Sequence, residues 1–243
     1  MTARNAISPA TAIALSHHHY VESVLDRELY SEAEAARLLR LAPSTLHWWL
    51  EGGERRGRRY RPVLRVEPTG SRSVSWAEFI EAGLLRQYRR AHQVPLPELR
   101  KMIDILREQW GAHPLVHQQP YVGPGRRLLV EAQEEAGLRP AYKLVAVVSG
   151  QLVLLPPAES FVEKVEWDHD LPVRWRPHAD PKSPVRIDPE VRFGRPAVRG
   201  ISTEVIWEHV EADESFGEVA DQFDLTPDEV RWAYAYEISA RAA

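Results

Sequence analysis

The chain has 243 residues, of which 44% are hydrophobic and 27% are charged, and its formal net charge is −4. It contains no cysteine, which excludes disulfides, thiolate metal sites and cysteine nucleophiles. No apolar run approaches the ~20 residues that cross a bilayer, and no signal peptide is evident, so we expect a cytoplasmic protein without a membrane segment.

The charge is divided unevenly between the two halves of the chain. Residues 1–120 carry a net charge of +4 and residues 121–243 a net charge of −8. Ten acidic residues and no Lys or Arg lie between Ile201 and Val230. This asymmetry favours a basic half that faces nucleic acid and an acidic half with another role. The alternative is a pair of ordinary domains that differ in charge.

Residues 1–28 show no clean periodicity and predict a loosely held tail or a short helix. Three adjacent histidines, His17, His18 and His19, lie in this tail. Adjacent residues of a regular element cannot all face one ion, and no acidic pair nearby completes a ligand set. We therefore expect no metal site and no cofactor here.

The segment LYSEAEAARLLRLAPSTLHWWLEGG, residues 29–53, predicts two short helices joined by a tight turn. Ser31 and Glu34 have the spacing of a capping box, and Pro43 suits the first turn of a second helix. The Gly-Gly pair at 52–53 ends that helix. This pattern indicates a helix-turn-helix, whose second helix exposes Ser44, Thr45, His47 and Trp48.

The next segment, RRGRRYR at 55–61, places five arginines and a tyrosine in seven positions. Two strand-like runs follow it, RPVLRV at 61–66 and RSVSW at 72–76. A basic run beside a recognition helix and two strands has the position of a wing that contacts DNA phosphates. A solvated loop is the alternative, and Trp48 is equally compatible with the core. The candidate DNA contacts are Ser44, Thr45, His47, Trp48, Arg55, Arg56, Arg58, Arg59, Tyr60 and Arg61.

The middle of the chain predicts two amphipathic helices and then mostly strands. SWAEFIEAGLLRQYRRAH at 75–92 has helical spacing, and a second helix follows two prolines. GRRLLVEA at 125–132 and KLVAVVSGQLVLL at 143–155 suggest strands, the latter with a hairpin turn at Ser149–Gly150. VEKVEW and VRWRP suggest another strand pair. EWDHD at 166–170, between these runs, is interpreted as a solvated turn. The composition from Pro177 to Pro184 suggests a linker.

The C-terminal part predicts three helices. Ser215 with Glu218, and Thr226 with Glu229, have capping-box spacing. The last two helices give a second helix-turn-helix shape near Leu225, whose many carboxylates argue against DNA contact. A Gly- and Pro-bounded stretch before these helices carries Arg192, Arg195 and Arg199.

No catalytic pattern is evident in the sequence. There is no phosphate-binding or dinucleotide-binding glycine motif and no Gly-x-Ser-x-Gly elbow. We therefore expect no catalytic residues and no enzyme activity.

Residues 29–115 resemble MerR-type winged helix-turn-helix regulators. The similarity lies in YSEAEAARLLRLAPSTLHWWLEGG and in SVSWAEFIEAGLLRQYRRA. The chain departs from that family because it has no cysteines for metal sensing and no long C-terminal coiled coil. A metal or drug sensor of the usual kind is therefore not expected.

Residues 187–240 resemble a small helical domain of unknown function that is common in bacterial type II toxin–antitoxin loci. The similarity lies in Asp188–Pro189, GRPAVRG and ESFGEVADQFDLTPDEV, although one basic position of that family is missing at 200–202. With the MerR-like head, this domain is similar to a VapB-class antitoxin paired with a PIN-domain ribonuclease toxin. The resemblance implies toxin neutralisation and repression of the operon. Arg192, Arg195 and Arg199 would face the carboxylates of the toxin, or else pair with the acidic helices of their own domain.

The predicted fold class is mainly α with small β elements. We expect a tail (1–28), a winged helix-turn-helix (29–115), a mixed α/β middle domain with linker (116–186) and a helical toxin-binding or self-association domain (187–243). Two-fold operator DNA favours a homodimer. Two alternatives stay open: a regulator without a toxin, whose C-terminal half dimerises or binds a small molecule, and an interaction protein whose basic head binds RNA or an acidic protein.

Overall fold

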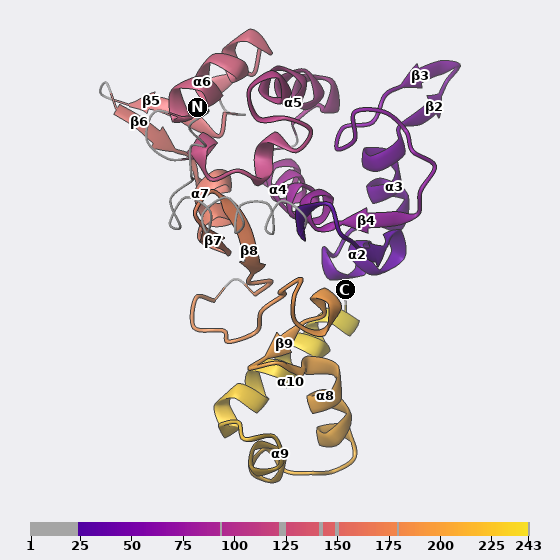
Figure 1. Ribbon diagram of the computed structural model, residues 1–243, viewed down its shortest axis with the longest axis vertical. Coiled ribbons are helices and arrows are strands. Elements are labelled where there is room, and N and C mark those ends of the chain that lie inside the picture. The colour runs from indigo at the N-terminus through magenta and orange to yellow at the C-terminus, as the bar shows by residue number, and fades with distance from the viewer. Residues whose placement is uncertain are drawn as a thin grey trace, which may run out of the picture.

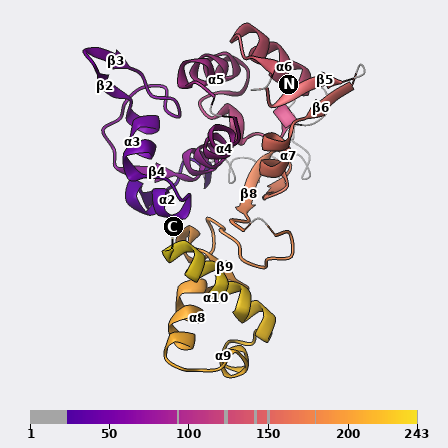
Figure 2. The same cartoon turned by 180° about the vertical axis from the view of Figure 1, so that it is seen from behind.

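The computed structural model describes residues 24–92, 94–121, 125–140, 143–148, 151–178 and 180–242. Most of the predicted tail, with His17, His18 and His19, lies outside these residues. Figure 1 shows a larger body above a smaller one, and Figure 2 shows the same division from behind. The described chain is mainly α with five two-stranded antiparallel sheets, which confirms the predicted fold class.

The larger body contains, in chain order, β1 (Glu28–Ser31), α2 (Glu32–Leu38), α3 (Pro43–Glu51), β2 (Gly53–Arg55), β3 (Arg58–Tyr60), β4 (Ser73–Ser75), α4 (Trp76–His92), α5 (Leu96–Trp110), η1 (Pro114–Val116), η2 (Gln119–Tyr121), α6 (Gly125–Glu135), β5 (Val145–Val148), β6 (Gln151–Leu154), α7 (Pro156–Val162), β7 (Val165–Asp168) and β8 (Leu171–Trp175). The smaller body contains η4 (Arg192–Gly194), β9 (Ala197–Val198), β10 (Ile201–Ser202), α8 (Thr203–Glu211), α9 (Phe216–Phe223) and α10 (Pro227–Arg241). None of the helices described is long and apolar enough to cross a membrane.

Each body has its own hydrophobic core, and the larger core extends from Val24 to Ile187. Phe79 of α4 stacks on Trp76 with ring centroids 5.6 Å apart and meets Trp175 of β8 edge-on at 5.4 Å. The indole Nε1 of Trp76 donates to the carbonyl of Pro172 at 2.8 Å. Residues 29–115 and 116–186 therefore share one core, and the predicted boundary between them crosses it.

The first two helices lie where the sequence predicts them. Ser31 caps α2 by accepting from the Glu34 N–H at 3.2 Å, while the Glu34 carboxylate lies 3.5 Å from Arg195. Pro43 is the first residue of α3, and Gly52 ends that helix with a φ of 66°. Local capping signals therefore determine both helices.

The strand predicted at RPVLRV, residues 61–66, is wrong. Val63 and Leu64 are consecutive and both fully buried, whereas neighbours in a strand face opposite sides. Their N–H groups both donate to the carbonyl of Trp49, at 2.8 and 2.9 Å. The strand at 73–75 forms, but it pairs with β1. The arginine-rich segment itself makes the hairpin β2–β3.

The strand suggested at GRRLLVEA is also wrong, because this segment begins α6. Its buried residues are Leu129, Val130, Ala132 and Gln133, which recur with helical spacing. A short apolar run does not by itself distinguish a strand from a helix, and helix-forming Gln and Glu continue the segment. The predicted helices α4 and α5 are confirmed.

The two later strand pairs form as the sequence predicts. In β5–β6, Val148 lies opposite Gln151, and the expected turn at Ser149–Gly150 falls outside the described residues. In β7–β8, Asp168 lies opposite Leu171, and His169 between them has a φ of 56°.

The smaller body contains the three predicted C-terminal helices, and both capping boxes are complete. Ser215 and Glu218 exchange bonds at the start of α9, and Thr226 and Glu229 at the start of α10. These sites need only residues three apart, so the sequence is sufficient to predict them.

Backbone bridges join the two bodies just after the predicted linker. Ile187 bridges to Trp175 of β8, and Arg186 bridges to Ala197 of β9. Ile187 lies in the larger core, whereas Val185 lies in the smaller one. The chain between 185 and 187 therefore belongs to both bodies.

The partly buried His113 pairs with the buried Glu81 in the larger body. The His113 Nδ1 lies 3.0 Å from one Glu81 carboxylate oxygen, and the Leu115 N–H donates to the other at 3.0 Å. Burial alone lowers the pKa of His113, but the hydrogen bond and charge of Glu81 outweigh burial and raise it. Because the pKa of His113 is raised in the folded state, its protonation stabilises the folded protein, and this contribution is fully present below the unfolded pKa of about 6.5. The contribution is lost as the pH rises through the pKa of His113 in the folded state.

We therefore expect Glu81→Gln to remove this pH dependence. Urea unfolding should show that the stability advantage of wild type over Glu81→Gln declines above about pH 6.5. A pH-independent difference between wild type and Glu81→Gln would contradict the assignment.

Candidate functional site

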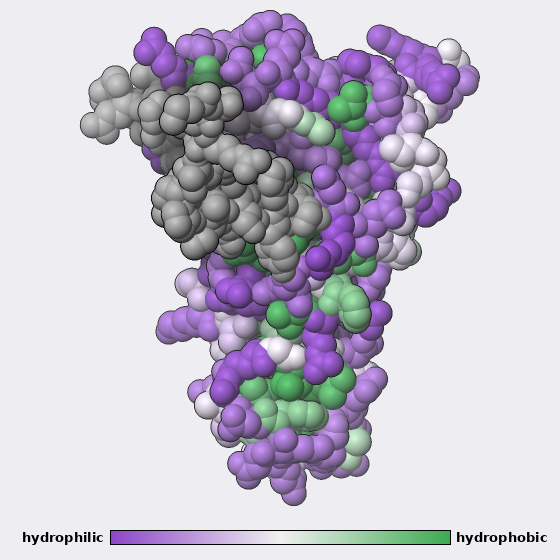
Figure 3. Space-filling view, viewed as in Figure 1, coloured by the Kyte–Doolittle hydropathy of each residue, from purple (hydrophilic) through white to green (hydrophobic). Residues whose placement is uncertain are grey.

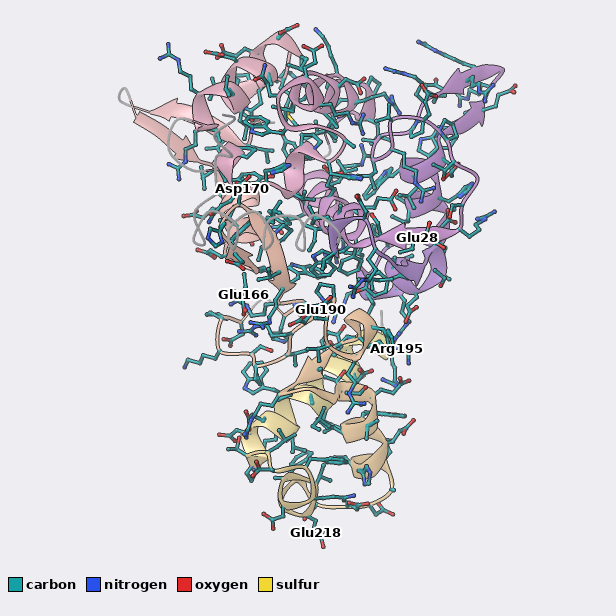
Figure 4. The ribbon with its side chains drawn as sticks, in the orientation of Figure 1. Glu28, Glu166, Asp170, Glu190, Arg195 and Glu218 are labelled. Carbon is teal, nitrogen blue, oxygen red and sulfur yellow. The ribbon has the colours of Figure 1, made fainter. Side chains whose placement is uncertain are left out.

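Four arginines of the β2–β3 hairpin are exposed at one corner of the larger body. Arg55 lies opposite Arg58, and Arg56 and Gly57 form the turn with φ of 53° and 72°. Positive φ at both central residues matches the twist of an antiparallel hairpin. Arg59 is the fourth, and no ion pair joins any of the four to a carboxylate in the described part of the chain. Figure 4 shows long side chains extending from this hairpin, and Figure 3 shows a hydrophilic surface there.

Arg61 is held differently from these four. Its guanidinium lies 2.8 Å from the Asp104 carboxylate of α5, and its carbonyl accepts a bond from Arg100 at 2.8 Å. Arg61 therefore connects the base of the hairpin to α5.

The aromatic residues Trp48 and Tyr60 support the hairpin. Their ring centroids lie 5.8 Å apart, and Trp48 also lies directly beside Gly53, where a side-chain carbon would approach its ring to 3.0 Å. The Arg58 guanidinium lies 5.5 Å above the Tyr60 ring. These contacts join α3 to the hairpin.

The outer surface of α3 contains the remaining predicted DNA contacts. Ser44 is exposed and Thr45 is half-buried. His47 is 40% exposed, and its Nδ1 lies 2.9 Å from the buried carboxylate of Glu32. Arg72, which sequence reasoning missed, is 74% exposed and bonds the same carboxylate at 2.7 Å. A cavity of about 350 Å³ is lined here by Ser31, Glu32, Ala33, Pro43, Ser44, His47 and Arg72.

Arg65 anchors the segment that follows the hairpin. Only 7% of its side chain is exposed, and it donates to Glu78 at 2.6 Å, to Thr69 at 2.7 Å, to the Ser73 carbonyl at 2.7 Å and to Glu51. Burial alone would raise the pKa of Glu51, but hydrogen bonds from Gly70, Thr69 and Arg65 hold it below its usual value. The cluster joins α3, α4 and the 65–73 loop.

The second candidate surface is the loop 192–200, which begins with two strained residues. Arg192 and Phe193 have positive φ angles of 51° and 55°, a left-handed backbone conformation that is unfavourable for residues other than glycine. This backbone leaves Phe193 82% exposed. Sequence reasoning missed Phe193, because a single phenylalanine in a sequence is usually a core residue.

The three arginines of this loop have different partners. Arg192 donates its Nε to the Gly200 carbonyl at 2.9 Å. Arg195 lies 3.5 Å from Glu34 of α2 and is otherwise exposed. Arg199 donates to the carbonyl of Asp224 at 2.7 Å and lies 4.0 Å from Glu229, so it pairs with the acidic helices of its own body.

The loop also contacts the larger body. The buried Tyr30 hydroxyl donates to the Gly194 carbonyl at 2.7 Å, and Arg27 pairs with Glu190 at 2.7 Å. Figure 4 shows Glu190 and Arg195 at this junction. A cavity of about 410 Å³ opens beside them, lined by Leu29, Glu34, Arg192, Phe193, Arg195, Ser202, Glu204 and Val205.

The acidic segment EWDHD was predicted as a solvated turn, which is wrong for its first three residues because they belong to β7. Its side chains form ion pairs. Glu166 lies 2.5 Å from Arg186 and 3.4 Å from Arg174, and Asp170 lies 2.8 Å from His117. Burial would raise the pKa of Glu166, but these two arginines lower it. Across the described residues, no three His, Asp or Glu side chains are grouped as metal ligands would be.

Known proteins resemble this chain over different lengths. Residues 185–236 match a family model described as "Protein of unknown function (DUF433)". The chain is 38% identical over 135 residues to "Uncharacterized protein Rv2308" of Mycobacterium tuberculosis, a match that spans 55% of this chain and 56% of that protein. It is 30% identical over 229 residues to "Putative antitoxin VapB45" of the same organism, covering 87% of this chain and 94% of that protein. The X-ray crystal structure of Rv2018 from M. tuberculosis is similar with a TM-score of 0.68 and 27% identity, over 86% of this chain and 98% of that one.

Proposed function

The chain belongs to the family of "Putative antitoxin VapB45", and from this premise we propose that it is the antitoxin of a type II toxin–antitoxin system. The observation that carries the proposal is similarity along 94% of that relative, through both bodies of the fold. In this proposal the protein is a regulator rather than an enzyme. It binds and neutralises a PIN-domain ribonuclease toxin and represses its own operon by binding operator DNA.

The proposed DNA interface combines the β2–β3 hairpin with α3, as in a MerR-like winged helix-turn-helix. Arg55, Arg56, Arg58 and Arg59 are exposed and lack carboxylate partners in the described chain, so their guanidinium groups are available to phosphates. Ser44, Thr45 and His47 would contact the major groove or its edges, and Arg72 would add a phosphate contact.

The remaining candidates have mainly supporting roles in this proposal. Trp48 and Tyr60 pack together and hold the hairpin against α3, and Arg61 holds its base on α5. We propose that two copies bind together, since a two-fold operator suits a two-fold dimer.

The proposed toxin surface is the loop 192–200. Arg192 and Arg195 are exposed and suit pairing with the carboxylates of a PIN-type nuclease site. Arg199 is already paired within its own body and would position the loop. Phe193 adds a large exposed aromatic side chain, the kind of residue that anchors protein interfaces.

Phe193→Ser tests this surface. We expect it to weaken binding of the toxin by roughly 30-fold, because an anchoring aromatic contributes about 2 kcal/mol or more. The measurement is affinity for the protein encoded by the neighbouring gene, co-expressed and purified. Val66→Ser removes another exposed apolar side chain and is the matched control. Equal affinities for the two variants would place the toxin contact elsewhere.

The function as a whole is tested by co-expression with the neighbouring gene. A small partner that co-purifies, loses ribonuclease activity in the complex and shifts promoter DNA with this chain supports the proposal. Promoter binding without any partner favours a regulator without a toxin. That second candidate gains weight from a cavity of about 280 Å³ at the junction of the two bodies, whose lining includes Arg40, Arg86, Lys164 and His178.

A further inference from the structure

A cavity of about 280 Å³ lies at the junction of the two bodies, and its described lining includes no residue of the hairpin or of the 192–200 loop. Its walls come from the end of α2, from α4, from the ends of α7 and β8, and from α10. In Figure 1 this junction lies below the larger body, whereas the β2–β3 hairpin projects from the upper right of that body. The side chains that concern its chemistry are Arg40, Arg86, Lys164, His178, Trp175 and Tyr236.

The lining is strongly cationic. It contains two arginines, one lysine and one histidine, and no Asp or Glu among its described residues. Burial lowers the pKa of Lys164, and the nearby Arg86 and Arg176 lower it further against the opposing effect of Glu163. The cations therefore repel one another.

The pKa of His178 is lowered by burial and by the same excess of positive charge. Burial lowers its pKa first, and Arg40, Lys164 and Arg176 lower it too, while only Asp180 acts in the opposite direction. The ring of His178 is fixed edge-on against Trp232, with centroids 5.1 Å apart.

Two buried donors add to the positive potential around the cavity. The Trp175 indole N–H and the Arg176 Nε–H have no acceptor among the described residues, and Trp175 is only 8% exposed. Buried donors are rarely left without a partner. Trp175 lines the cavity, whereas Arg176 follows it in the chain and is not part of the lining, so the Trp175 indole is the donor that a bound oxyanion would satisfy.

The side chain of Arg40 reaches the cavity from an unusual backbone position. Arg40 has a φ of 51° just after α2, where glycine fits best, and its Nη2 donates to the Ser239 hydroxyl of α10 at 2.6 Å. The cavity thus has one wall on the helix-turn-helix and another on the last helix.

We propose that this cavity is a binding site for a small ligand that carries one or two phosphate groups. Several converging cations favour a multiply charged oxyanion over a single carboxylate, and the arginine fork matches phosphate oxygens. A volume of 280 Å³ suits a small molecule and excludes a nucleic-acid duplex. The ligand would lie between the two bodies and contact both, an activity separate from toxin and operator binding.

The test is isothermal titration calorimetry of the full chain with pyrophosphate. We expect saturable binding with a dissociation constant below about 1 mM, at least about tenfold weaker in Lys164→Gln, and retained in Lys164→Arg. Lys182→Gln removes an exposed lysine outside the cavity and should bind as wild type does.

Two further readouts make the test specific. Without ligand, Lys164→Gln should raise the melting temperature, because it relieves repulsion among the cations; with pyrophosphate, wild type should gain more than the variant. A variant with Arg55, Arg56, Arg58 and Arg59 all changed to glutamine should bind pyrophosphate unchanged. Absence of saturation up to about 10 mM, equal binding by Lys164→Gln, or loss of binding in the hairpin variant would each overturn the proposal.

Discussion

Changing Arg55, Arg56, Arg58 and Arg59 together to glutamine is expected to abolish operator binding at physiological salt. Each arginine that neutralises a phosphate contributes about 0.9 to the slope of log affinity against log salt. Removing four contacts should lower that slope by up to about 3.6 per protomer. The slope can be measured by titrating promoter DNA at several salt concentrations.

The physical basis of this effect is the exposure of the hairpin. The four side chains are exposed and have no carboxylate partner among the described residues. Arg58 contacts the Tyr60 ring at the surface, and we expect the change of all four to leave the fold intact. Substitutions at such surface positions usually change stability by no more than about 0.5 kcal/mol each. Lost DNA binding with an unchanged melting temperature would therefore identify a direct contact.

The matched control changes arginines that lie elsewhere on the surface. Arg127 and Arg231 are both exposed, on α6 and α10. Their replacement with glutamine alters the net charge without altering the hairpin. If this control lowers the salt slope per residue as much as the hairpin variant does, the effect is one of overall charge and the proposed interface is wrong.

Arg65→Met is expected to destabilise the protein by about 3–5 kcal/mol, because it leaves two buried carboxylates without their cation. Glu51 and Glu78 are each about nine-tenths buried and both bond Arg65. Methionine fills a similar volume, so the effect measures the uncompensated charge rather than a cavity. Chemical denaturation at neutral pH gives the free energy of unfolding.

A triple variant separates charge from packing. Arg65→Met combined with Glu51→Gln and Glu78→Gln removes the whole ionic cluster and should recover part of the lost stability. If Arg65→Met changes the free energy of unfolding by less than about 1 kcal/mol, the buried cluster does not stabilise the loop as described.

The same cluster makes stability sensitive to acid. The pKa of Glu51 is lowered in the folded state, so the unfolded chain takes up a proton first as the pH falls. Its contribution is therefore present above the ordinary carboxyl pKa and is lost as the pH falls through the lower, folded value.

Several elements of this protein follow from the sequence because their causes are local. The capping pairs Ser215 with Glu218 and Thr226 with Glu229 act across three residues, and both formed as predicted. The helix pair α2–α3 likewise follows from Ser31, from the first-turn position of Pro43 and from the glycine after α3. Composition and periodicity were sufficient for the fold class.

Other elements depended on residues far apart in the chain. The 61–66 segment alternates like a strand, yet its conformation is set by Arg65, whose carboxylate partners lie on α3 and α4. The strand error at α6 arose because a short apolar run is compatible with both a strand and a helix. The buried Gln133 of this helix donates to the Val145 carbonyl at 3.0 Å, a partner that lies outside the segment. Neither segment contains a local sequence pattern from which its distant hydrogen-bond partners could be predicted.

The sequence by itself determined the capped helices α2, α3, α9 and α10, the two charged halves and the density of arginine at 55–61, since each depends on neighbours within a few residues. Only the tertiary structure decided how these side chains are used. It left four hairpin arginines exposed while pairing Arg61 with Asp104, and it exposed Phe193 through a strained backbone held by Tyr30. It also gathered Arg40, Arg86 and Lys164 around one cavity, because long-range packing, rather than sequence spacing, sets which charges meet.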